Sequence, residues 1–169
     1  MRVHRLERVQ RVPLPLEEAF AFYGSADNLE RITPPWLRFA IQEPRPGRLA
    51  AGTLLHYSLV LHRFPVRWTT QIRTWEPPHR FVDVQLRGPY RLWEHTHTFE
   101  PVEGGTLITD RVRYALPLGP LGAIAHVAFV RRDLRRIFDY RRDAIAAILA
   151  QPAEAARPRS RSASSDASK

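Results

Sequence analysis

Two histidines in this sequence have the type and spacing to do acid–base chemistry. His95 and His97 stand two residues apart in the strand-like run Arg91–Glu100, and histidine changes its charge near neutral pH. Alternate residues of a strand share a face, so both histidines would lie on the same face as Trp93 and Phe99. If that apolar face points inward, we expect His95 and His97 to line a cavity.

Asp110 is the predicted partner of these histidines. It lies in the run Thr106–Tyr114, where alternation with apolar residues places it on the same inward face. A carboxylate beside an imidazole orients the ring or favours its charged form. Two roles stay open for His95, His97 and Asp110. Either they contact a ligand or have a structural role, or they act as the acid–base groups of an enzyme, with Tyr57 as a further candidate.

Metal and nucleophile chemistry have little support in the sequence. Two histidines at i and i+2, with a carboxylate elsewhere in the chain, are not a typical metal signature, so we expect no metal site. The chain has no cysteine, no Gly-x-Ser-x-Gly elbow and no phosphate-binding glycine loop. We therefore expect no cofactor and no covalent nucleophile.

An arginine interrupts the apolar stripe of the longest periodic segment, Pro120–Leu149, which predicts an amphipathic helix. Arg141 lies well inside that stripe, where an unpaired charge would be costly. We expect it to reach a carboxylate such as Asp110 or Asp83, a ligand anion, or solvent at a pocket mouth. Long arginine side chains also extend past apolar surfaces to water, and that alternative stays open.

The elements that must position these residues follow from periodicity and turn signals. Val3–Val12 predicts a first strand, Leu16–Tyr23 a short helix, and Asp27–Arg31 a second short helix capped by Asp27. Six strand-like runs separated by glycine or proline turns follow: Leu37–Gln42, Thr53–Leu61, Val66–Trp75, Arg80–Leu86, Arg91–Glu100 and Thr106–Tyr114. The order predicts an α+β fold, a curved antiparallel sheet of about seven strands packed against the long C-terminal helix.

Curling of such a sheet leaves room for a cavity against the helix. The inward face of Arg80–Leu86 stays open, because Val82, Val84 and Leu86 form one face and Phe81, Asp83 and Gln85 the other. Aromatic side chains complete the predicted wall. The residues expected to contact a ligand are Tyr57, Trp68, Trp93, His95, His97, Asp110, Tyr114, Phe138 and Arg141.

Composition limits the function classes further. The 169 residues carry a net charge of +9, but the only lysine is Lys169, so the arginine-rich excess is weak support for nucleic-acid binding. We expect no specific nucleic-acid partner, and leave open peripheral contact with an anionic membrane. No apolar run of about 18 residues is present, so we expect a cytoplasmic protein. Residues 1–150 predict one ligand-binding domain and 151–169 a disordered Arg/Ser/Ala-rich tail; no oligomeric state is indicated.

Several stretches together resemble bacterial members of the SRPBCC superfamily. They are the stretch from Asn28 to Leu37, Gly88-Pro89-Tyr90 followed by Trp93–Phe99, Gly104–Asp110 and Ile137–Arg141. The resemblance covers roughly residues 1–149. This superfamily comprises START/birch-pollen-allergen-like helix-grip domains and includes the polyketide cyclase/dehydrase and coenzyme Q-binding families.

The resemblance implies a helix-grip fold with a deep apolar cavity for lipids, sterols, polyketides or quinones. It therefore implies sequestration or delivery of a hydrophobic small molecule, with a polyketide cyclase/dehydratase-type enzyme as the alternative. No catalytic set carries over residue by residue, because these relatives use scattered polar pocket residues in place of one shared motif.

Overall fold

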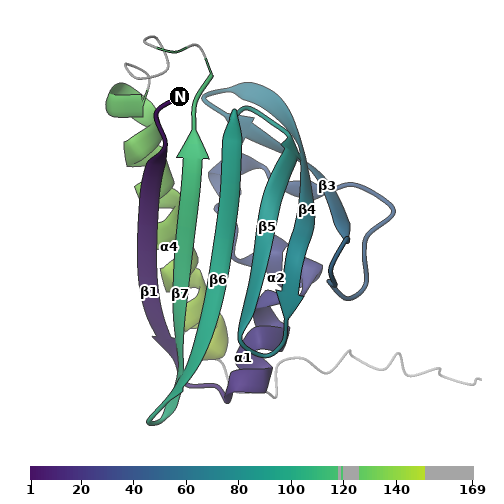
Figure 1. Cartoon of the computed structure of the whole chain (residues 1–169), viewed down its shortest axis with the longest axis vertical. Helices are drawn as coiled ribbons and strands as arrows, with labels where there is room; N and C mark the ends of the chain where they lie inside the picture. Colours follow the sequence, from purple (N-terminus) through teal and green to yellow (C-terminus); the bar gives the residue numbers. More distant parts are fainter. Residues whose placement is uncertain (118, 120–125, 151–169) are drawn as a thin grey trace, which may run out of the picture.

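Seven strands form one antiparallel sheet in the computed structural model, which describes residues 1–117, 119 and 126–150. The strands are β1 (His4–Val12), β2 (Ala40–Ile41), β3 (Leu54–Leu61), β4 (Phe64–Glu76), β5 (Arg80–Arg87), β6 (Leu92–Val102) and β7 (Gly105–Ala115). Their order across the sheet is β1-β7-β6-β5-β4-β3-β2. In Figure 1 the sheet curves, and the helices lie together on its concave side. This is the predicted α+β helix-grip fold.

The helical elements are α1 (Leu16–Tyr23), α2 (Ala26–Arg31), a 3-10 turn η1 (Pro35–Leu37), a π-helical turn η2 (His126–Val130) and the long α4 (Arg131–Leu149). In Figure 1 α4 passes behind β1 and β7, while α1 and α2 lie behind the other half of the sheet. None of the helices described in the structure is long and apolar enough to span a bilayer.

The start of α2 differs from the sequence prediction. Ser25, and not Asp27, occupies the N-cap position, and Asp27 lies in the first turn. The reason is local: Ser25 is extended and forms an isolated bridge with Arg48, so the helix begins directly after it. The negative charge of Asp27 still lies near the helix N-terminus, where it is favourable.

The run Leu37–Gln42 was predicted as a strand, and most of it is not. Leu37 ends the 3-10 turn η1, which begins at Pro35. Arg38 then takes a left-handed conformation with φ of 46°, so that only Ala40 and Ile41 pair with β3. Pro34 and Pro35 explain the departure, because proline fixes φ and favours a turn over a central strand. The five later strands agree with their predicted bounds to within two residues.

The predicted helix Pro120–Leu149 is confirmed in its main part. Regular α-helix begins at Arg131, after the π-helical turn η2, while residues 120–125 lie outside the described residues. The predicted disordered tail, residues 151–169, also lies outside them. Leu134, Phe138 and Ile145 of α4 are buried, as the apolar stripe predicts.

Buried side chains form three clusters around a central space. One joins α1 to the middle of the sheet, where the Phe20 and Phe99 rings lie 5.2 Å apart. A second lies beneath β3 and β4 and includes Leu55. The third joins β7 to α4 through Val112 and Phe138. Members of each cluster or side chains packed against it line a cavity between the sheet and α4.

Candidate functional site

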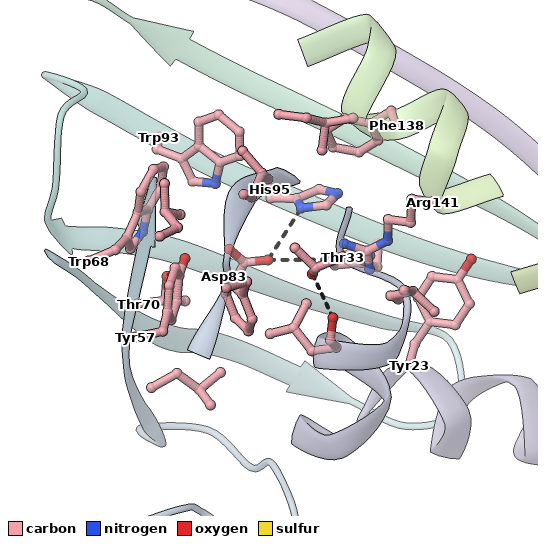
Figure 2. Close-up of a pocket in the computed structure, with 18 of the residues that line it drawn as sticks. Tyr23, Thr33, Tyr57, Trp68, Thr70, Asp83, Trp93, His95, Phe138 and Arg141 are labelled. Atoms are coloured by element: carbon pink, nitrogen blue, oxygen red, sulfur yellow. Dashed lines mark hydrogen bonds and ion pairs between the residues drawn. The ribbon is translucent and has the colours of Figure 1, made fainter. Parts of the chain in front are cut away.

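A cavity of about 170 Å³ lies between the curved sheet and α4. Alternate residues of β3 and β4 supply one wall and α4 another, so most of the lining is apolar; examples are Leu55, Leu59, Ile72 and Leu134. The cavity is also lined by seven residues that the sequence predicted as ligand contacts: Tyr57, Trp68, Trp93, His95, His97, Phe138 and Arg141. Figure 2 shows Trp68 and Trp93 on one side of Asp83 and His95, with Tyr23 and Arg141 on the other.

Asp110 and Tyr114 of β7 point inward but are not among the residues that line this cavity. The ring of Tyr114 packs against those of Tyr90 and Trp93, with centroids 5.9 and 6.3 Å apart. Asp110 is buried against His95 and His97. Val112 and Tyr114 of β7 pack in one buried cluster with Leu134 and Phe138 of α4, so α4 covers this part of the sheet.

His95 and His97 lie between two carboxylates. Asp83 Oδ2 is 3.5 Å from His95 Nδ1 and 3.2 Å from His97 Nε2. Asp110 Oδ1 is 3.2 Å from His95 Nε2 and 2.6 Å from His97 Nδ1, the last contact departing from hydrogen-bond angles. The two imidazole centroids are 3.8 Å apart. We call these four residues the His–Asp cluster.

Strand register brings the cluster together. Asp83 of β5 pairs directly with His95 of β6, and His97 of β6 pairs directly with Asp110 of β7. Residues opposite one another in antiparallel strands have Cβ atoms about 4.5–5.5 Å apart, so their side chains interact. Phe81 stacks on His97 with centroids 4.1 Å apart, which fixes that ring from the side.

The two histidines have different electrostatic surroundings. Burial and the neighbouring His97 lower the pKa of His95, which therefore favours the neutral form. Burial also disfavours a charged His97, but the carboxylates of Asp110 and Asp83 outweigh burial and raise its pKa. Burial disfavours ionised carboxylates too, yet the histidines keep the pKa of Asp83 low and that of Asp110 well below its usual value. The cluster therefore combines two ionised carboxylates with one readily charged imidazole.

Asp83 is the cluster member whose place the sequence left undecided. The structure settles the open face of β5: Phe81 and Asp83 line the cavity, while Val82 and Val84 are buried without lining it. Both faces of this strand are partly apolar, so alternation alone did not distinguish them. The β5–β6 register, which pairs Asp83 with His95, is the signal that would have found it.

Arg141 lies at the cavity, on the helix face the apolar stripe predicts. It makes no ion pair with Asp83 or Asp110 within the described residues, and its Nε atom is buried without a hydrogen-bond partner there. Its guanidinium carbon lies 5.6 Å from the centroid of the Tyr23 ring, a cation–π contact. The charge of Arg141 also contributes to the low pKa of Asp83.

Besides His97 Nδ1, three buried polar atoms that can donate have no hydrogen-bond partner among the described residues: Tyr23 Oη, Trp68 Nε1 and Arg141 Nε. Tyrosine hydroxyls donate or accept, whereas indole and guanidinium nitrogens only donate. Burial raises the pKa of Tyr23, which keeps its hydroxyl protonated. A buried donor without a partner costs about 1–3 kcal/mol, so these groups favour a ligand that brings acceptor oxygens.

Comparison with known proteins adds a family and a fold. Residues 3–150 match the family model described as "Polyketide cyclase / dehydrase and lipid transport". None of the curated proteins matches the chain in sequence.

Similar solved structures come from several different organisms. Protein Ms6760 from Mycobacterium smegmatis is 16% identical, with a TM-score of 0.63 over 86% of this chain and 90% of that one. TTHA0849 from Thermus thermophilus is 20% identical, with a TM-score of 0.60 over 87% and 99%. Ginseng major latex-like protein 151 from Panax ginseng is 9% identical, with a TM-score of 0.62 over 88% and 99%. At these identities the likeness shows a shared fold alone.

Proposed function

Because the chain belongs to the polyketide cyclase / dehydrase and lipid transport family, we propose that it binds an apolar small molecule that carries carbonyl or carboxylate oxygens. The observation that carries the proposal is the cavity beneath α4, whose apolar wall holds the unpaired donors of Tyr23, Trp68 and Arg141. Sequestration or delivery of such a molecule needs no further chemistry from the protein.

Cavity size restricts the ligand. A dry apolar cavity of roughly 150 Å³ accepts benzene, so about 170 Å³ accommodates one substituted ring. A second hollow of about 640 Å³ shares Leu37, Leu61 and Ile137 with the cavity. We call it the outer hollow; Trp36, Arg38, Val60, His62, Arg63, Pro65, Asp133 and Arg136 line the rest of it. A longer lipid or polyketide would extend past the three shared residues into this space.

The unpaired donors distinguish between ligand chemistries. A plain hydrocarbon would leave the Trp68 and Arg141 N–H groups buried and unsatisfied, whereas a quinone, polyketide or fatty acid brings oxygen acceptors to them. Arg141 would favour an oxygen with negative charge, because hydrogen bonds to charged groups are the stronger ones. We therefore favour oxygen-bearing ligands over hydrocarbons.

A cyclase or dehydratase is the second candidate, and the His–Asp cluster is the observation that favours it. His95 favours the neutral form and His97 the charged form, so the cavity wall holds a base beside an acid. In a dehydration, His95 would take a proton from a carbon next to a carbonyl. His97 would protonate the departing hydroxyl, so that water leaves and a double bond forms.

Contact with an anionic membrane is a further proposal, supported by the surface around the outer hollow. Arg38, Arg63 and Arg136 line that hollow. Trp36 and Phe64 are 40% and 72% exposed. Aromatic and cationic side chains together favour a negatively charged lipid surface. Co-sedimentation with anionic vesicles that weakens at high salt would support this contact, and equal binding to neutral vesicles would contradict it.

A blocked cavity tests the binding proposal. Leu55 is buried and lines the cavity, whereas its neighbour Leu54 points outward and is 43% exposed. Leu55→Trp should abolish the fluorescence gain of the apolar dye ANS and its displacement by a naphthoquinone carboxylate. Leu54→Trp, the matched control, should leave both unchanged. Equal dye binding by the two folded variants would place the apolar site elsewhere and overturn the proposal.

A further inference from the structure

The His–Asp cluster contains a mismatch between donors and acceptors. Each imidazole faces Asp110 with one ring nitrogen and Asp83 with the other. A neutral imidazole has one N–H and one lone pair. His95 Nε2 meets Asp110 Oδ1, and His97 Nε2 meets Asp83 Oδ2, with hydrogen-bond geometry, whereas His97 Nδ1 has no such partner among the described residues. With both neutral rings protonated at Nε2, the His95 Nδ1 lone pair faces Asp83 and the His97 Nδ1 lone pair faces Asp110, and each of these carboxylates is itself an acceptor. With His97 protonated at Nδ1 instead, both lone pairs and Asp83 Oδ2 converge on one point.

Extra protons do not remove this mismatch cleanly. Two imidazolium rings with centroids 3.8 Å apart would place like charges against each other in a buried site. A single imidazolium leaves the other histidine with a lone pair facing a carboxylate. A divalent cation at the convergence point would use both lone pairs and the Asp83 oxygen together.

The two distances from Asp83 to the histidines suit such a cation. Ligand atoms of Asp83, His95 and His97 all lie within 4.8 Å of one another. Asp83 Oδ2 is 3.5 Å from His95 Nδ1 and 3.2 Å from His97 Nε2. A metal bound at about 2.0–2.2 Å to nitrogen and oxygen ligands separates neighbouring ligand atoms by about 3.0–3.5 Å. We propose that Asp83, His95 and His97 form a binding site for a divalent transition-metal ion such as Zn²⁺.

Asp110 would position the two imidazole ligands. Metal-bound histidines usually donate their other ring N–H to a carboxylate, which fixes the tautomer and the ring orientation. Asp110 Oδ1 lies 3.2 Å from His95 Nε2 and 2.6 Å from His97 Nδ1, on the side away from Asp83. The two carboxylates also balance the charge of a divalent ion in a buried site. One oxygen and two nitrogen ligands suit Zn²⁺ or Fe²⁺.

The cavity would supply the open coordination position. His95, His97 and Asp83 all line it, so a ligand oxygen in the cavity could complete the coordination of the metal. The sequence argued against a metal because two histidines at i and i+2 do not form a local motif. The third ligand comes from the neighbouring strand β5, through the pairing of Asp83 with His95.

Titration with Co²⁺ tests the metal site without reference to any organic ligand. Chelator-treated protein should bind one Co²⁺ per chain with visible absorption, lose that absorption to Zn²⁺, and unfold at a higher temperature when loaded. Asp83→Asn, which keeps the side-chain shape, should abolish the absorption. Asp110→Asn should weaken binding by about 10- to 100-fold, because it disturbs the orientation of both rings.

A matched control comes from the surface. His62 Nε2 lies 2.6 Å from Asp133 Oδ2 on exposed side chains, and His62→Ala should leave Co²⁺ binding unchanged. Absence of stoichiometric Co²⁺ binding by folded protein would overturn the proposal. So would binding that survives Asp83→Asn. Neither result would affect dye binding in the cavity, so the two proposals fail separately.

Discussion

Histidine meets aspartate in two different settings in the described part of the chain. In one, His62 Nε2 lies 2.6 Å from Asp133 Oδ2, with side chains 55% and 36% exposed. In the other, His95 and His97 have side chains only 5% and 3% exposed, and each contacts two carboxylates. Contact distance therefore does not separate the two settings, and burial does.

The difference shows where a histidine becomes useful for function. Water and salt screen the exposed pair, which links the β3–β4 turn to α4 and gains little from its charges. The buried cluster has lost water, so its charges must be satisfied by neighbouring side chains or by a bound group. The following predictions test this contrast, beginning with the largest expected effect.

Removal of Asp110 should have the largest effect on stability. Asp110→Ala leaves two buried histidines without the carboxylate that both contact, and breaking a buried charged pair costs about 3–5 kcal/mol. Urea unfolding of the variant and of Asp133→Ala, its exposed counterpart, measures the difference. A loss below about 1 kcal/mol for Asp110→Ala would mean that water reaches the cluster, and the contrast would fail.

Removal of Arg141 should have its main effect on binding. Arg141→Met keeps much of the length of the side chain but removes an unpaired donor at the cavity, and hydrogen bonds to charged groups contribute about 1.5–3 kcal/mol. Affinity for a naphthoquinone carboxylate, measured by ANS displacement, should fall accordingly, by about 10- to 100-fold. Arg142→Met, on the exposed side of α4, is the control and should bind normally. Equal affinities would show that Arg141 serves packing alone.

Removal of a hydrogen bond between two uncharged side chains of the cavity should have a smaller effect on stability. Tyr57 Oη and Thr70 Oγ1 lie 3.1 Å apart, so Tyr57→Phe removes one hydrogen bond without removing a charge. A neutral buried hydrogen bond contributes about 0.5–1.5 kcal/mol, which denaturant unfolding resolves. A loss as large as that of Asp110→Ala would mean that burial alone, and not charge, governs the stability of the cavity wall.

Much of the fold and of the cavity lining could be predicted from the sequence, because it depends on patterns within single strands and helices. Alternation in Arg91–Glu100 placed His95 and His97 together on the inner face, and the stripe of the last helix placed Arg141 at the cavity. Both periods are properties of a single element. The sequence of one strand or helix therefore shows its period, whatever that element packs against.

The parts of the site that the sequence did not predict depend on how neighbouring strands and helices pack against one another. Asp83 belongs to a strand with apolar residues on both faces, so only its register with β6 shows that it meets His95. Asp110 lies on the inward face, as predicted, but only the contacts with β6 and the packing of α4 against β7 show that it meets the histidines and does not line the cavity. Register and coverage are not contained in the periodicity of one strand.

The smallest effect should come from the exposed pair. His62 and Asp133 make a short contact, yet side chains this exposed contribute about 0–1 kcal/mol because water and side-chain entropy offset the attraction. His62→Ala should therefore change the free energy of unfolding by less than about 1 kcal/mol, and that small change should shrink further in 1 M salt, where the screening length is about 3 Å. If His62→Ala instead destabilised the protein as much as Asp110→Ala, the contact distance would decide the energetics of these pairs. Burial would then be the wrong explanation for the difference between the two settings.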